Sequence, residues 1–147
     1  MRPLAYAASS LAVLALAGCG KGGTPTWAGP PDPEADGTVS VEEFAAYQRD
    51  VEEPWEGSAA MAAAEFLRLD ERTATTTTIE GQAGPEGTGP ETVTVTLEGL
   101  LDDSVHAERW TLEFEPDGEN YVLTHATRSQ RCQPGRGHQD FSSEPCV

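Results

Sequence analysis

Beyond residue 40, hydrophobic positions first recur with a helical period. Ser40 and Glu43 have the spacing of a capping box, which predicts that a helix begins there. Val41, Phe44, Gln48 and Val51 follow at helical spacing. Pro54 is expected to stop or kink this helix, because proline cannot donate to the helical hydrogen-bond ladder. A second helix is predicted to begin at Ser58, with an apolar face formed by Ala59, Ala62, Phe66 and Leu69.

After residue 72 the pattern changes to the alternation that is typical of β-strands. The run 73–79 is rich in threonine and favours a strand, whereas 81–90 is rich in glycine and is expected to be a loop. Two further strands have apolar sides formed by Val93, Val95, Leu97, Trp110, Leu112 and Phe114, and Tyr121, Leu123 and His125 alternate on a third. The sequence Pro116-Asp117-Gly118 predicts a turn between the last two strands. The predicted fold is therefore α+β, with two N-terminal helices packed on a four-stranded antiparallel meander.

This order of elements across Ser40 to Arg131 resembles the NTF2-like and cystatin-like α+β families. The resemblance implies that helices pack on the concave face of a curled sheet. It also implies either a small-ligand pocket between helices and sheet or a non-catalytic interaction module. Bulky side chains on the predicted helix-facing side favour the second alternative, because they are large enough to fill the space. These residues are Phe44, Phe66, Trp110, Leu112 and Phe114.

Residues 1–18 have the organisation of a secretory signal peptide, in which Arg2 precedes an apolar run and small residues lead into the cleavage site. At roughly 14 residues, this run is too short to span a bilayer, where about 20 are needed. The sequence Leu16-Ala17-Gly18-Cys19 resembles a lipobox, the processing site of bacterial lipoproteins. The resemblance implies diacylglycerol transfer to Cys19, cleavage before it, and stable anchoring by two acyl chains at the outer face of the cell membrane. The alternatives are an ordinary cleaved signal and a buried apolar helix.

Residues 19–39 are predicted to be the acylated cysteine followed by a semi-extended tether, because prolines and glycines prevent regular secondary structure there. Trp27 is unusual in such a segment. It would either touch the membrane interface or dock back onto the domain. The single α+β domain is predicted to occupy residues 40–147 and to end in a disulfide-closed loop.

The segment 32–43 fits the spacing of an EF-hand calcium loop. Its oxygen donors would be Asp32, Glu34, Asp36, Thr38 and Glu43. Donors at alternate positions can surround one Ca²⁺, and a glutamate at the twelfth position closes the shell from the first turn of a helix. The loop departs from the pattern because Glu34 is long for its position, Pro33 stiffens the chain, and Gly29-Pro30-Pro31 excludes an entering helix. An acidic linker that runs into a turn and a capping box explains the same residues without metal.

The chain holds 25 acidic and 9 basic residues, which give a net charge of −16. Such a surface repels nucleic acid and anionic lipid headgroups, so neither is an expected partner. The charge either attracts a cation or a basic protein, or keeps the protein soluble outside the cell. The sequence has no nucleophile elbow and no phosphate-binding glycine loop, so no enzymatic activity is expected. His106 and His125 lie on predicted neighbouring strands, with Asp102 and Asp103 near His106. A two-histidine, one-carboxylate metal site can be drawn from them, although exposed strand histidines are far commoner than ligands.

Cys132 and Cys146 remain as a pair once Cys19 is lipidated, and export places them in an oxidising compartment. They are predicted to form a disulfide, and a catalytic or metal-binding pair is the alternative. Basic residues gather around them in an otherwise acidic chain, namely Arg128, Arg131, Arg136 and His138. This segment resembles the closing part of an uncharacterised exported family of high-GC Gram-positive bacteria. Its side chains would bind an acidic partner or an anion, or pair with the acidic body.

Together these features predict a lipid-anchored extracytoplasmic domain that acts as a non-enzymatic interaction module at the cell surface. Its expected partner is a protein or an envelope component. The alternative is a lipoprotein that binds a small ligand or Ca²⁺, through a cavity under the helices or through the acidic loop.

Overall fold

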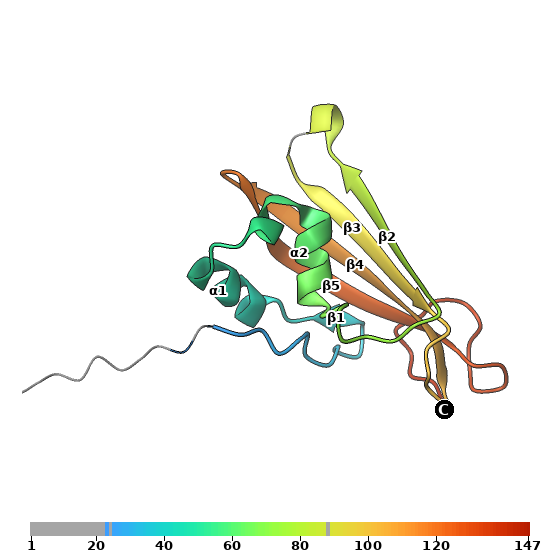
Figure 1. The fold of residues 1–147 in the computed structure, drawn as a ribbon. Coiled ribbons are helices and arrows are strands. Elements are labelled where there is room, and N and C mark those ends of the chain that lie inside the picture. The colour runs from blue at the N-terminus through green and yellow to red at the C-terminus, as the bar shows by residue number, and fades with distance from the viewer. Residues whose placement is uncertain (1–22, 24, 88) are drawn as a thin grey trace, which may run out of the picture.

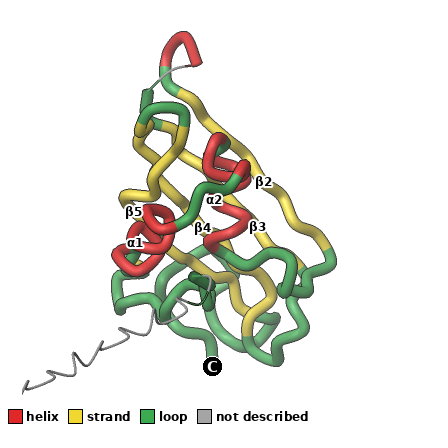
Figure 2. The backbone as a smooth tube through the Cα atoms, turned by 60° about the vertical axis from the view of Figure 1, so that its left-hand side comes forward, coloured by secondary structure: helices red, strands yellow, loops and turns green. Residues whose placement is uncertain are grey.

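The protein is described by a computed structural model that covers residues 23, 25–87 and 89–147 (Figure 1). It has an α+β fold in which two helices pack on one face of a five-stranded antiparallel open sheet (Figures 1 and 2). The predicted class is confirmed, and the sheet has one strand more than the predicted meander. The signal peptide and the lipobox lie outside the described residues. No helix of the described part is both long and apolar enough to cross a membrane.

The helix layer consists of α1 (Glu42–Asp50), the short 3-10 helix η1 (Pro54–Gly57) and α2 (Ala59–Phe66). The predicted capping box at the start of α1 is wrong, because Val41 is the N-cap and no side chain caps the helix there. Val39 is still paired with the sheet, so the chain leaves its strand at Ser40 and turns into the helix later than predicted. A capping box does form in η1, between Glu53 and Glu56.

The second helix begins where the sequence predicted. The Ser58 hydroxyl accepts a hydrogen bond of 3.4 Å from the Met61 amide and so caps α2. The helix ends at Phe66, before Leu69, which was the last residue of the predicted apolar face. Arg68 follows in the left-handed region with φ of 50°, which costs a non-glycine residue on the order of 1 kcal/mol. Its guanidinium donates a hydrogen bond to the carbonyl oxygen of Trp27, so this arginine ties the N-terminal segment to the end of α2.

The sheet has the order β1-β5-β4-β3-β2, and every neighbouring pair is antiparallel. Its strands are β1 (Thr38–Val39), β2 (Thr76–Ala83), β3 (Glu91–Glu98), β4 (Val105–Asp117) and β5 (Asn120–Cys132). The predicted loop 81–90 is shorter than expected, because residues 81–83 continue β2 against β3. All eight residues of β2 are exposed, so backbone pairing with β3 holds this strand in place, not burial.

β1 is the strand that the hydrophobic pattern did not predict. Thr38 pairs with Thr127 and Val39 pairs with Ala126, which places the end of the predicted tether at the edge of the sheet. Two residues are too few to show the alternation by which strands are recognised. The packed fold therefore includes residues before Ser40.

β4 and β5 form a long hairpin that is closed by a two-residue turn at 118–119 (Figure 1). The register shifts directly after the pair Glu113–His125, so that Leu123 is buried while His125 is exposed. The predicted alternation at the end of the chain is therefore interrupted. His106 lies toward the opposite end of the same strand pair, and the two-histidine site is not formed.

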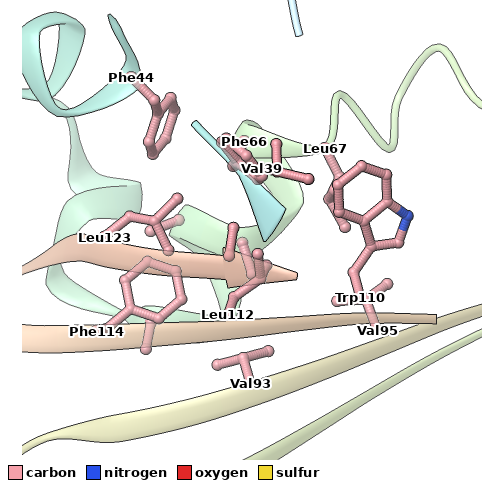
Figure 3. Packing of buried hydrophobic residues seen from close by; sticks show 14 of the residues in the cluster. Val39, Phe44, Phe66, Leu67, Val93, Val95, Trp110, Leu112, Phe114 and Leu123 are labelled. Atoms are coloured by element: carbon pink, nitrogen blue, oxygen red, sulfur yellow. The ribbon is translucent and has the colours of Figure 1, made fainter. Parts of the chain in front are cut away.

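Buried side chains from both layers fill the space between helices and sheet (Figure 3). The cluster includes Phe44, Phe66, Leu67, Val93, Val95, Trp110, Leu112, Phe114 and Leu123. The five bulky residues that the sequence assigned to this side are all buried, which confirms the predicted core. The rings of Phe66 and Trp110 meet edge to face across the layers, with centroids 6.3 Å apart.

Trp27 belongs to this core although it lies in the predicted tether. Only 6% of its surface is exposed, and its indole N–H donates a hydrogen bond of 2.7 Å to the Phe66 carbonyl. Its ring lies against Phe44, with centroids 5.0 Å apart. Of the two alternatives for this residue, the structure shows docking onto the domain.

Candidate functional site

The carboxylates of the predicted calcium loop do not converge in the structure. Asp32, Glu34 and Asp36 are exposed, and within the described residues they form no group of ligand atoms within 4.8 Å of one another. Asp36 instead accepts a hydrogen bond of 2.9 Å from the Thr38 amide, which lowers the pKa of the Asp36 carboxyl. Thr38 belongs to β1 and Glu43 to α1. The segment therefore forms a turn that leads into the sheet.

Cys132 and Cys146 form the predicted disulfide, and their sequence separation is 14. The ring of His138 lies beside the two sulfurs. Its two nitrogens face the carbonyl oxygens of Glu144 at 2.9 Å and Asp140 at 2.8 Å. The pKa of His138 is raised, first by the Glu144 contact and then by the Asp140 contact, because both bonds form together only when both nitrogens carry a proton. Since both sulfurs are in the disulfide, this cluster organises the loop and offers no thiolate to a metal.

Two of the predicted partner residues are already paired within the protein. An Arg128 nitrogen lies 2.7 Å from a Glu108 oxygen, and an Arg131 nitrogen lies 2.8 Å from a Glu98 oxygen. Arg136 is exposed on the disulfide loop. Of the two alternatives for these arginines, pairing with the acidic body describes Arg128 and Arg131.

Glu108 connects the sheet to the turn after α2. One of its carboxylate oxygens lies 2.8 Å from Arg72 and 3.1 Å from the indole nitrogen of Trp110, and the other oxygen lies 2.7 Å from Arg128. The carboxylate side chain is 13% exposed, so two charged partners compensate the cost of its burial. These ion pairs join the sheet to the turn after α2, and we assign this cluster a structural role.

One large apolar side chain of α2 is exposed, on the side of the helix that points away from its buried face. Met61 is 53% exposed there. A groove of about 390 Å³ is lined by Trp55, Met61, Ala64, Glu65, Leu69 and Asp70. We call these six residues the outer helix surface. They come from η1, from α2 and from the turn that follows α2.

A second groove, of about 280 Å³, continues this surface toward the N-terminal segment. It is lined by Pro25, Thr26, Trp27, Tyr47, Glu65, Arg68 and Asp70. The rings of Tyr47 and Trp55 stack between the grooves, with centroids 6.0 Å apart and planes 14° apart. The Tyr47 hydroxyl donates a hydrogen bond of 3.2 Å to Glu65. Burial, and then the charge of Glu65, raise the pKa of Tyr47, so this hydroxyl keeps its proton at neutral pH.

The outer helix surface combines the features of a recognition surface. Trp and Met are enriched at protein interfaces, and a flexible methionine adapts to different partners. The Glu65 carboxylate lies beside the apolar side chains and favours a partner that carries positive charge, whereas the Asp70 carboxylate lies 3.5 Å from Arg68 of the same chain. The arrangement therefore suits a partner in which an apolar side chain lies next to a basic side chain.

The hydrophobic pattern did not point to this surface. Trp55 lies in the break after Pro54, and Leu69 was assigned to the buried face of the second helix. One feature of the sequence did indicate this surface. Met61 is a large apolar residue that directly precedes Ala62 and therefore lies outside the predicted apolar face of the second helix.

Comparison of the chain with protein-family models, with curated proteins and with solved structures found no match. The function is therefore inferred from the chain's own residues and their geometry.

Proposed function

We propose that this protein is a lipid-anchored extracytoplasmic domain that acts as a non-enzymatic interaction module at the cell surface. Diacylglyceryl-Cys19 would hold it to the outer face of the cell membrane, and a protein or an envelope component would be its partner. The observation that carries the proposal is the outer helix surface, where the exposed Met61 and the half-buried Trp55 and Leu69 line one groove with two carboxylates. The filled core supports an outward-facing role, because a ligand would have to displace buried aromatic rings to enter between the layers.

Charge supports a basic and apolar segment as the part of the partner that is recognised. The chain has a net charge of −16, and Glu65 and Asp70 line both grooves of the helix layer. Rim charges of this kind steer association with a cationic partner more than they add affinity. Trp55 and Met61 would provide the apolar contact area.

The position of Trp27 supports a short distance between the domain and the membrane. Trp27 is buried in the core, and Pro25 and Thr26 line the second groove. The chain between Cys19 and Pro25 spans at most about 20 Å when fully extended. An anchor at Cys19 would therefore hold the outer helix surface near the bilayer.

We also retain the NTF2-like or cystatin-like scaffold as a prediction. Helices that cover one face of an antiparallel sheet and precede four of its five strands support it. In such a scaffold with a filled core, recognition would take place on the outside of the helices.

The anchor is tested by Cys19→Ala in cells that express the full-length chain. We expect the wild-type protein to have a mass that includes the lipid and the variant to have a mass without it. Lys21→Ala is the matched control, because it changes a neighbouring residue and leaves the lipobox intact. A wild-type protein whose mass does not include the lipid would contradict the anchor.

The recognition surface is tested by photo-crosslinking in the same cells. A photoreactive amino acid at position 61 is expected to capture one recurrent partner, whereas the same group at position 101 captures none. Leu101 is the control because it is apolar and 89% exposed but lies outside both grooves. Glu65→Arg is expected to abolish the product at position 61, because it reverses the charge that both grooves share. The same products from positions 61 and 101, or a product that persists with Glu65→Arg, would refute this assignment.

A further inference from the structure

β2 is an edge strand whose outer side has no partner strand within the described part of the chain. It lies at the end of the sheet, and all eight of its residues are exposed. It pairs with β3 without a register shift, contains no proline and no lysine, and carries one charge, on Glu80. Proteins usually shield edge strands with bulges, prolines or lysines, because unpaired backbone groups are a template for another strand. β2 has none of these protections.

Ile79 lies at the exposed end of a row of buried side chains. Val95 pairs with Ile79 on one side and with Trp110 on the other, so the three residues share the helix-facing side of the sheet. Val95 and Trp110 are buried, whereas Ile79 is 42% exposed. The apolar row of the core thus ends at the free edge of the sheet.

We propose that β2 pairs in antiparallel orientation with β2 of a second copy of this chain, about a two-fold axis at Ile79. Such an axis is perpendicular to the sheet, so the helix layers of both copies lie on the same face and opposing residues share a face. Ile79 then faces Ile79 of the second copy, and the apolar row continues across the interface. Thr78 faces Glu80 of the second copy, where a hydroxyl can donate to a carboxylate.

The order of residues along β2 favours this register and favours a second copy of the chain as the pairing partner. Because opposing residues must share a face, the axis passes through a residue and not between two residues. An axis at Glu80 would pair the same length of strand but would place two carboxylates opposite each other, which is destabilising. The axis at Ile79 avoids this repulsion and buries the exposed isoleucine. In a chain with a net charge of −16, a strand with one charge in eight residues is also a place where two copies repel each other little.

The pairing is tested by disulfide trapping in intact cells that make the full-length chain, with a membrane-permeable oxidant. Ile79→Cys is expected to give a disulfide-linked dimer that a reductant converts to monomer. Directly opposed residues of antiparallel strands have Cα atoms about 4.5–5.5 Å apart, which is within the range that a disulfide spans. Thr77→Cys is the matched control. It lies on the same face of the same strand, but in the proposed register it faces Gly81 of the second copy and not its own counterpart.

The outcome is read as the fraction of chain that migrates as a dimer without reductant. A dimer from Ile79→Cys and a monomer from Thr77→Cys is the expected result. A monomer from Ile79→Cys, equal dimers from both variants, or a stronger dimer from Glu80→Cys would each overturn the proposal. Unchanged protease resistance of the Ile79→Cys monomer shows that the fold is retained. The assay works wherever the chain is located, so it is independent of the proposed anchor.

Discussion

Replacing Trp27 with alanine is expected to lower the free energy of unfolding by about 3–5 kcal/mol, the range for truncation of a large buried aromatic residue. The ring is buried against Phe44 and Phe66, and its N–H bonds to the Phe66 carbonyl. The substitution leaves a cavity in the core and removes the contact that holds the N-terminal segment. Urea denaturation monitored by circular dichroism measures the loss, and hydrogen exchange should show faster exchange in residues 25–39.

Trp27→Phe is the matched control for this prediction. It retains most of the buried ring and removes the hydrogen bond to the Phe66 carbonyl, so a loss of about 1–3 kcal/mol is expected. A Trp27→Ala protein with wild-type stability would show that the segment before β1 does not belong to the packed fold.

Replacing both disulfide cysteines with serine is expected to lower the free energy of unfolding by about 3 kcal/mol. The disulfide closes a loop of about 15 residues and so lowers the entropy of the unfolded chain, which stabilises the folded protein by about that free energy. The Cys132–Cys146 bond closes such a loop at the end of β5. The loss is measured by urea denaturation of Cys132→Ser/Cys146→Ser against the oxidised wild-type protein.

Reduction provides the control for the disulfide prediction. The reduced wild-type protein should match the double variant, because both lack the same covalent link. Equal stability of the oxidised wild-type protein and the double variant would contradict the prediction. It would mean that the backbone bonds from Gln130 to Ser142 and from Cys132 to His138 hold the segment without the link.

Strand positions in this protein could be predicted where alternation ran over several residues. Val93, Val95 and Leu97 are all buried, as the pattern indicated, because a strand with one covered face repeats every second residue. The same rule failed at His125, since the register shift in β5 changes which residues face the core. A shift of this kind depends on the partner strand and leaves no mark in the local pattern.

Helix starts could be predicted only where the capping residue was free to act. Ser58 caps α2 as expected, whereas Ser40 does not cap α1. The difference lies in β1, because pairing of Val39 with Ala126 keeps the chain extended up to Ser40. Sheet pairing therefore moved the start of α1 past the residue that local chemistry favoured.

The candidate sites also differed in how far they could be predicted, because some depend on local sequence and others on tertiary contacts. Pairing of Cys132 with Cys146 followed from the number of cysteines and is present in the structure. The acidic segment had the spacing of a calcium loop, yet the turn into β1 leaves its carboxylates apart. The outer helix surface was not predicted, because Trp55 and Leu69 come together only when η1 and the turn after α2 pack around the helix.

The sequence by itself determined the α+β class, the residues that fill the core and the disulfide, because period, side-chain size and cysteine number are local properties of the chain. Only the tertiary structure decided the pairing of β1, the docking of Trp27, the ion pairs of Glu108 and the exposed edge at Ile79. Each of these depends on residues that are far apart in sequence. Their contacts are set by how the layers pack, which no local pattern records.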